Sequence, residues 1–199
     1  MISGFLEQPS SDDVHKDLEG PILDLFNFYV DVGIAARFPL HNSGDKYLFH
    51  WPKPNYLTKR VLLWQDCIDF DFTLLSISEK NAVVRVVHVP WQTNCPVPAE
   101  WQETQLAVWM TNRVMTDTEN NWAQVTKPAS DGTVFAAVGR EIIDVEVTME
   151  RPSGKIIHAK MYNPVEISER SCTDKTLAQC GEPTRYQILR EIKLDAIHQ

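Results

Sequence analysis

The spacing of hydrophobic residues changes along the chain, from helical near the start to strand-like in the middle. Between Pro21 and Pro39 apolar side chains recur every three or four residues, which is typical of a helix that buries one face. Pro21 suits a first helical position, and Pro39 ends the pattern. The sequence therefore predicts a helix over residues 21–38. Its apolar face comprises Ile22, Leu25, Phe26, Tyr29, Val32 and Ala36.

A short strand at residues 46–51 and a second helix at residues 55–66 are predicted next. Two prolines end the strand, and Asn55 can cap the helix that follows. Leu63 and Trp64 lie on the same side of that helix.

Beyond the second helix polar and apolar residues alternate, as they do in half-buried strands. Residues 69–73 and 82–91 are predicted to pair as a hairpin around a turn at residues 79–81. A further strand is predicted at residues 105–115. Residues 133–151 form a long predicted strand, which returns through a turn at residues 152–154 into a strand at residues 155–162.

Two short helices are predicted at the end of the chain, at residues 174–180 and 184–196. In the second, Tyr186, Leu189, Ile192 and Ala196 share one helical face. Helices first, antiparallel strands next and a helical tail indicate an α+β fold. We expect a flexible arm at residues 1–13, one domain at residues 14–167 and a helical extension at residues 168–199.

Charge and composition exclude some classes of partner. The chain of 199 residues carries a formal charge of −8, so the phosphates of a nucleic acid would be repelled. No apolar run approaches the roughly 18 residues that span a bilayer, and the start lacks a signal-peptide pattern. We therefore expect a cytoplasmic protein with no nucleic-acid or membrane partner. Its four cysteines are expected to be free thiols, with a local Cys172–Cys180 bridge as the alternative in an oxidising compartment.

Three segments, taken in order, carry a resemblance to a known family. They are residues 64–73, which end in Asp-Phe-Asp-Phe-Thr, residues 139–143, and residues 154–156 followed by Tyr-Asn-Pro at 162–164. This order resembles the SnoaL-like members of the nuclear-transport-factor-2-like superfamily, and most of all the phenazine-biosynthesis A/B proteins. The resemblance implies a cone-shaped, strongly curved, mainly antiparallel sheet, packed by N-terminal helices around a pocket for a small hydrophobic molecule. It also implies a homodimer.

The chain departs from that family at its chemistry. The family places a catalytic His on its second helix and a Glu near the end of its last strand. Here the second predicted helix has no His, and Lys160 stands about where the Glu would be. Residues 92–132 also form a longer connection than the family has.

Polar side chains gather on one face of the last predicted hairpin. Asp144 and Glu146 lie on one strand, and His158, Lys160 and Tyr162 lie on the other. A carboxylate beside His or Lys can bring the pKa of a catalytic base near neutrality, and the Tyr162 hydroxyl can donate a hydrogen bond to a developing oxyanion. We predict that these five residues catalyse an isomerase, cyclase or dehydratase reaction with no metal and no nucleotide cofactor.

Aromatic side chains would supply flat walls for the ligand. The predicted ligand contacts are Phe26, Tyr29, Trp64, His88, Trp91 and Trp109. Two alternatives stay open. The polar hairpin face can be an exposed, ion-paired surface, and the protein can be a binding or dimerisation module without catalysis.

Overall fold

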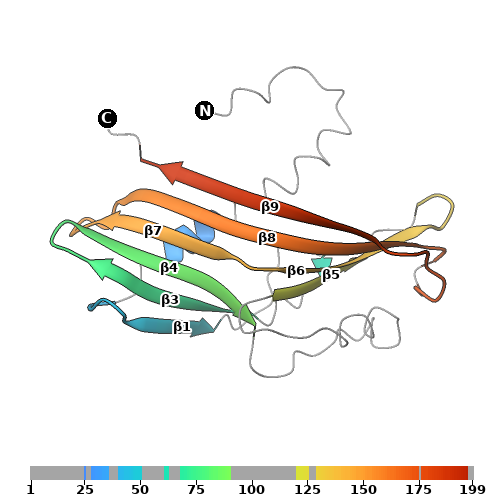
Figure 1. The fold of residues 1–199 in the computed structure, drawn as a ribbon, viewed down its shortest axis with the longest axis horizontal. Helices are drawn as coiled ribbons and strands as arrows, with labels where there is room; N and C mark the ends of the chain where they lie inside the picture. The colour runs from blue at the N-terminus through green and yellow to red at the C-terminus, as the bar shows by residue number, and fades with distance from the viewer. Residues whose placement is uncertain are drawn as a thin grey trace, which may run out of the picture.

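A nine-stranded antiparallel sheet makes up most of the structure, a computed structural model (Figure 1). The residues that it describes are 25, 28–35, 40–50, 61–62, 68–90, 120–125, 129–174 and 176–196. The strands are β1 (Lys46–His50), β2 (Val61–Leu62), β3 (Ile68–Ile77), β4 (Asn81–Pro90), β5 (Asn120–Val125), β6 (Val134–Glu141), β7 (Asp144–Glu150), β8 (Ile156–Cys172) and β9 (Thr184–Asp195). One helix, at residues 25 and 28–35, is present among these residues.

The long strand β8 organises the sheet, whose order is β1-β3-β4-β7-β8-β6-β5-β2, with β9 on the other edge of β8. Both β6 and β7 pair with β8, end to end along one edge. The register continues from one to the other, since Glu141 lies opposite Val165 and Asp144 lies opposite Tyr162. The predicted long strand over residues 133–151 is therefore present, interrupted at residues 142 and 143. The sheet forks there, because β4 follows β7 whereas β5 follows β6.

The helix covers one face of the sheet over β3, β4, β7 and β8, and Figure 1 shows it behind these strands. Its residues Phe28, Val32 and Ala35 are buried in the main core. The strands contribute alternate apolar residues to this core, as a sheet with one covered face requires. The buried strand residues are Phe72, Leu74, Ala82, Val84, Val86, Val145, Val147, Met149, Ala159 and Met161, and Ile143, between β6 and β7, joins them.

The buried face changes sides along β8. Its buried residues are odd-numbered up to Ile167, whereas Cys172 is buried on the opposite face together with Val134 and Val138 of β6. The loop after β8 covers this second cluster with Leu177, which is 1% exposed and has a positive φ of 57°.

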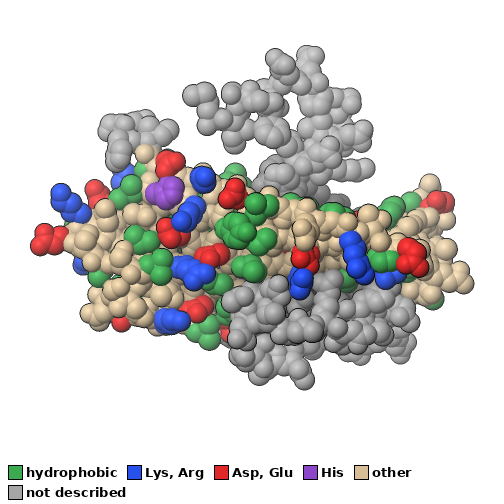
Figure 2. Space-filling model, in the orientation of Figure 1, with side chains coloured by type: hydrophobic (Ala, Val, Ile, Leu, Met, Phe, Trp, Pro, Cys, Tyr) green, Lys and Arg blue, Asp and Glu red, His purple; other side chains and the backbone are tan. Residues whose placement is uncertain are grey.

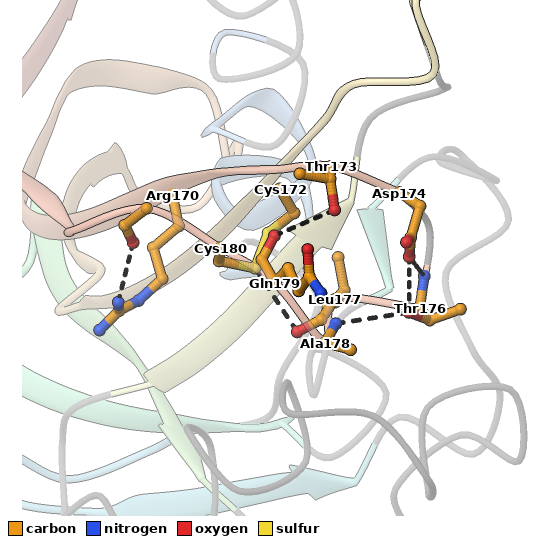
Figure 3. The surroundings of a disulfide bond; sticks show 10 residues. Arg170, Cys172, Thr173, Asp174, Thr176, Leu177, Ala178, Gln179 and Cys180 are labelled. Carbon is orange, nitrogen blue, oxygen red and sulfur yellow. Dashed lines mark hydrogen bonds between the residues drawn. A yellow bond between two sulfur atoms is a disulfide. The ribbon is translucent and has the colours of Figure 1, made fainter.

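A disulfide between Cys172 and Cys180 closes that loop (Figure 3). The expectation of free thiols is wrong for these two residues, and the alternative of a local bridge is the one observed. The other two cysteines lie outside the described residues.

The expected α+β cone with several N-terminal helices and a helical C-terminal extension is wrong. Thr184–Asp195 forms strand β9 rather than a helix, and residues 174–180 lie in the disulfide-closed loop. Where the second predicted helix is described, Val61–Leu62 is strand β2. Tertiary pairing decides at β9, because Ile192, which fits the predicted helical face, also alternates with Leu194 onto the main core.

Other predicted elements are confirmed. They are the helix at residues 28–35, the strand β1, the β3–β4 hairpin and the β7–β8 hairpin. Gly154 supplies the positive φ, 73°, that the second of these turns requires. The predicted strand at residues 105–115 lies outside the described residues. In the part of the chain that is described, no helix is long and apolar enough to cross a membrane.

Candidate functional site

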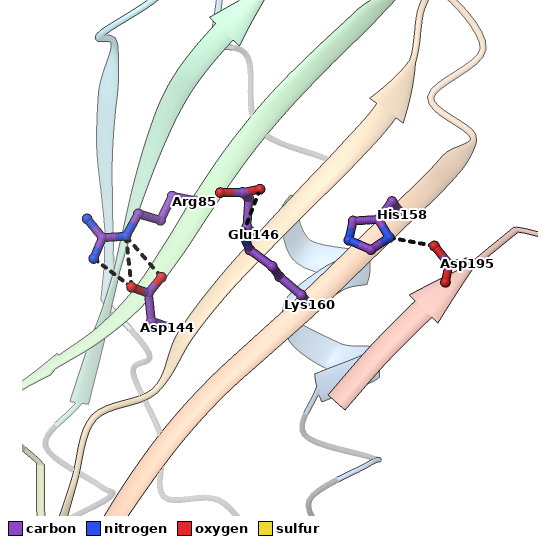
Figure 4. Close-up of polar contacts among 6 residues, drawn as sticks. All are labelled: Arg85, Asp144, Glu146, His158, Lys160 and Asp195. Carbon is purple, nitrogen blue, oxygen red and sulfur yellow. Dashed lines mark hydrogen bonds and ion pairs between the residues drawn. The ribbon is translucent and has the colours of Figure 1, made fainter. Parts of the chain in front are cut away.

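The five residues predicted to be catalytic do lie on one face of the sheet, opposite the helix. Figure 4 shows four of them, Asp144, Glu146, His158 and Lys160, with their partners. Each charged one has an ion-pair partner. Asp144 accepts hydrogen bonds from Arg85 at 2.9 Å from Nε and 2.6 Å from a terminal nitrogen. Lys160 Nζ lies 3.3 Å from Glu146 Oε1, and His158 Nδ1 lies 2.6 Å from Asp195 Oδ1.

These pairs face solvent rather than an enclosed chamber. The side chains of Arg85 and Lys160 are about half exposed, and Tyr162 is 49% exposed. The pKa of Arg85 is raised chiefly because Asp144 accepts its hydrogen bonds. Exposed ion pairs are screened by water and contribute little to stability. The arrangement is that of the alternative reading, a solvated and ion-paired sheet face.

An apolar patch interrupts this charged face where β6 gives way to β7. It consists of Ile142, Tyr162, Pro164 and Leu189, which line an open groove of about 330 Å³. Leu189 is 57% exposed and lies opposite Pro164 across β8 and β9. Figure 2 shows green apolar side chains near the centre of this face, with charged side chains on both sides.

Polar groups border the same groove. Arg140 Nε donates to Glu166 Oε2 at 2.7 Å, and Gln187 Nε2 donates to Glu166 Oε1 at 3.1 Å. A neighbouring depression of about 730 Å³ shares these three residues and adds Arg185 and Tyr186. The face therefore joins an apolar end to a hydrogen-bonding end that carries two arginines and one glutamate.

A second polar cluster lies on the buried side of the sheet. His88 Nε2 of β4 lies 2.8 Å from Asp31 Oδ2 of the helix, and the two residues are 7% and 2% exposed. The Phe70 ring and the His88 imidazole pack edge to face, with 4.5 Å between ring centroids. Such a pair can orient an imidazole, although the same contact also fastens the helix to the sheet.

The predicted ligand-contacting residues do not form one pocket in the described structure. Tyr29 lies on the helix and is 54% exposed, whereas His88 is buried beneath the helix. Phe26, Trp64, Trp91 and Trp109 lie outside the described residues. Among the described residues, no group of His, Cys, Asp and Glu side chains is arranged to hold a metal ion.

The residues that sequence reasoning missed are Asp31, Arg140, Glu166 and Leu189. Asp31 interrupts the apolar helix pattern between Phe28 and Val32, and a carboxylate on a buried helix face is a signal for a polar partner. The groove depends on the pairing of β9 with β8, which a helical reading of residues 184–196 excludes.

Comparison of the chain with known protein-family models, curated proteins and solved structures finds no match. The function therefore has to be inferred from the geometry of the molecule itself.

Proposed function

We propose that the protein is a non-catalytic binding module, whose exposed sheet face takes a small organic molecule with an apolar part and a polar, preferably anionic, part. The observation that carries this proposal is the groove at Ile142, Tyr162, Pro164 and Leu189. Its volume of about 330 Å³ lies at the lower end of the range of ligand sites.

Leaving this apolar patch exposed to water is unfavourable unless something covers it. Tyr162 and Leu189 are 49% and 57% exposed in the middle of a face made of ion pairs. Grouped exposed apolar side chains rimmed by polar residues are typical of binding surfaces, because covering them removes apolar area from water. A flat ring fits against Tyr162 and Pro164, where an aromatic side chain and a rigid pyrrolidine lie side by side in the groove lining.

The polar border favours an anion. Arg140 directs two nitrogens at one oxygen of Glu166, and Arg185 adds a second guanidinium to the adjoining depression. In the depression Arg140 and Arg185 outnumber Glu166, whereas the lining of the groove itself adds Glu141, so a carboxylate or sulfonate would be held at the Arg185 end.

A fluorescent probe with this chemistry, 8-anilinonaphthalene-1-sulfonate, tests the proposal. Titration into the folded protein should give a saturable fluorescence rise that Leu189→Ser weakens by about fivefold or more in Kd, the loss expected when one apolar contact is removed. The matched control is Leu48→Ser, because Leu48 is 59% exposed on β1 and lies outside the groove. Equal effects of the two substitutions would contradict the proposal.

Acid–base catalysis is the second candidate function, and the Asp31–His88 pair is the observation that favours it. A carboxylate that accepts from one imidazole nitrogen can leave the other nitrogen to move a proton. Catalysis requires a reagent to reach that nitrogen. Diethyl pyrocarbonate should therefore modify His88 in the folded protein if it is catalytic, and only after unfolding if the pair is structural. With His88 at 7% exposure, we expect modification only after unfolding.

A further inference from the structure

We infer that the outer edge of β9 pairs with β9 of a second copy of this chain, about a two-fold axis at Ile188, to form one continuous antiparallel sheet. This inference concerns an interaction surface and does not depend on the proposed ligand-binding function.

β9 has one described strand partner, β8. The two strands pair along their length, from Thr184 opposite Glu169 to Asp195 opposite His158. Within the described chain its other edge faces outward, and Figure 1 shows it as the outermost strand on that side. Edge strands that stay unpaired commonly carry a bulge, a proline, a very short length or charged side chains, and of these features β9 has only the charges, which are of both signs. β9 is 12 residues long, contains no proline and pairs with β8 without a register shift. It is therefore suited to pairing with another strand.

The phase of the hydrogen bonds shows which residues offer their main chain to a second strand. Ala196 N donates to Ile157 O at 2.8 Å, and the same register places Leu194 opposite Ala159. Because bonded and non-bonded residues alternate in an antiparallel pair, the even-numbered residues of β9 bond to β8. The main-chain groups of Arg185, Gln187, Leu189 and Glu191 then point outward.

Charge selects the register. With the two-fold axis at Ile188, Arg185 of each copy lies opposite Glu191 of the other, and Tyr186 lies opposite Arg190. Opposite charges and cation–π contacts favour this alignment. Moving the axis to Leu189 places Arg185 opposite Lys193, and moving it to Arg190 or Glu191 places a charge opposite itself. Like charges directly opposite each other are destabilising. An axis at Ile192 would also place Glu191 opposite Lys193, but it pairs only residues 189–195 of β9, whereas the axis at Ile188 pairs residues 184–192 and is therefore the favoured one.

The two-fold axis at Ile188 also places equivalent faces of the two sheets on the same side. A two-fold axis perpendicular to the sheet keeps the helix-covered faces of both copies on one side. The two grooves then lie on the other side, next to the joined β9 strands, because Gln187 and Leu189 belong to the groove lining. The apolar groove stays open in the dimer, whereas Arg185 of the adjoining depression also pairs with Glu191 of the second copy.

The molar mass of the full chain, measured by light scattering over a concentration series, tests the inference. The parent should be a dimer that dissociates on dilution. Arg185→Glu and Glu191→Arg should each weaken dimerisation by about tenfold or more, since two attractive pairs become repulsive. The double variant Arg185→Glu/Glu191→Arg should restore it, because the charges are exchanged across the axis.

The matched control is Lys193→Glu, which reverses a charge on the same strand beyond the span paired in this register. It should leave the dimer unchanged. A monomeric parent at every concentration, or a dimer that both single reversals leave intact, would overturn the inference. Circular dichroism of each variant distinguishes loss of the dimer from loss of the fold, and recovery in the double variant does so independently.

Discussion

Asn163 donates its side-chain amide to the main-chain carbonyl of Ile142 at 2.7 Å, at the position where β6 gives way to β7. In the shared register Pro164 lies opposite Ile142 and accepts from its N–H at 3.2 Å. Proline has no N–H to return to the Ile142 carbonyl. The Asn163 amide replaces that missing donor, and it also lies 3.1 Å from Glu141 Oε2. The Asn163 side chain thus supplies the hydrogen bond to the Ile142 carbonyl that the main chain of Pro164 cannot make.

Replacing Asn163 should therefore destabilise the fold. Asn163 is 1% exposed, and Asn163→Leu leaves the partly buried Ile142 carbonyl without its donor, at a cost of about 1–3 kcal/mol. Urea unfolding followed by tryptophan fluorescence measures this cost. Asn81→Leu, at the exposed start of β4, is the control and should change stability by less than about 0.5 kcal/mol. Equal losses would show that the bond to Ile142 has no special role.

The Asp31–His88 pair should contribute far more to stability than a surface pair of the same chemistry. Removing one partner leaves the other buried and unpaired, so Asp31→Leu and His88→Leu should each cost about 3 kcal/mol or more. The double variant should cost less than the sum of the two, because neither polar group remains. Urea unfolding of all three variants gives the coupling between the residues.

The exposed His158–Asp195 pair is the matched control. It has a similar separation, 2.6 Å, but its side chains are 36% and 79% exposed. Water and salt screen such a pair, so His158→Leu should cost less than about 1 kcal/mol. Similar losses for His158→Leu and His88→Leu would contradict the importance of burial.

The alternation of polar and apolar residues predicted the central strands, and it also indicated which face of the sheet is buried. Along β7 the residues Val145, Val147 and Met149 alternate with Asp144 and Glu146, and the apolar set is the one in the core. The family resemblance implied instead that the polar set faces a pocket. Physical chemistry alone favours the observed orientation, because burying several charges is far costlier than exposing them.

Other features of the site were beyond sequence reasoning. The apolar pattern of β9 fits both a strand and a helix. Ile188, Ile192 and Leu194 lie on one face of a strand, whereas Leu189 and Ile192 are spaced as in a helix. The long partner β8 decides in favour of the strand. Likewise His88 and Asp31 are 57 residues apart, and only the packing of the helix on β4 brings them together.

Asp45 should make stability depend on pH. Its carboxylate accepts hydrogen bonds from the main-chain amides of Asn42 and His41, and these hold its pKa below the ordinary value of 3.8. A pKa lowered by folding means that the ionised group stabilises the folded state at neutral pH. That contribution is present above the unfolded-state pKa and is lost as the pH falls through the lower folded-state pKa.

The Asp45→Ala variant should therefore unfold at lower urea concentration than the parent at neutral pH, and the difference should shrink as the solution is acidified below the ordinary aspartate range. Glu79→Ala in the exposed β3–β4 turn is the control and should change the urea midpoint little at neutral pH. A difference that stays constant down to strongly acidic pH would rule out the carboxylate as its source.

The Cys172–Cys180 bridge should be the main restraint on the loop that covers the second core cluster. The bridge spans 8 residues, and Leu177 within it is 1% exposed against Val134 and Val138. Closing a loop of this length stabilises a fold by about 2–3 kcal/mol. Cys172→Ser/Cys180→Ser, or the parent in a strong reductant, should lose that amount in urea unfolding. Thr176→Ala, which removes only the two hydrogen bonds of an exposed hydroxyl, to Asp174 and from the Ala178 amide, should lose much less.

The bridge can be checked directly in protein isolated from its own host. Peptides containing Cys172 and Cys180 should appear crosslinked, and neither thiol should react with iodoacetamide in the unfolded, unreduced chain. A bridge of this kind persists in oxidising compartments, whereas cytosolic thiols are kept reduced. Complete alkylation of both residues would mean that the burial of Leu177 and the main-chain hydrogen bonds of the loop hold it without the bridge, and would agree with the cytoplasmic location expected from the sequence. A crosslinked pair would argue for an oxidising compartment instead.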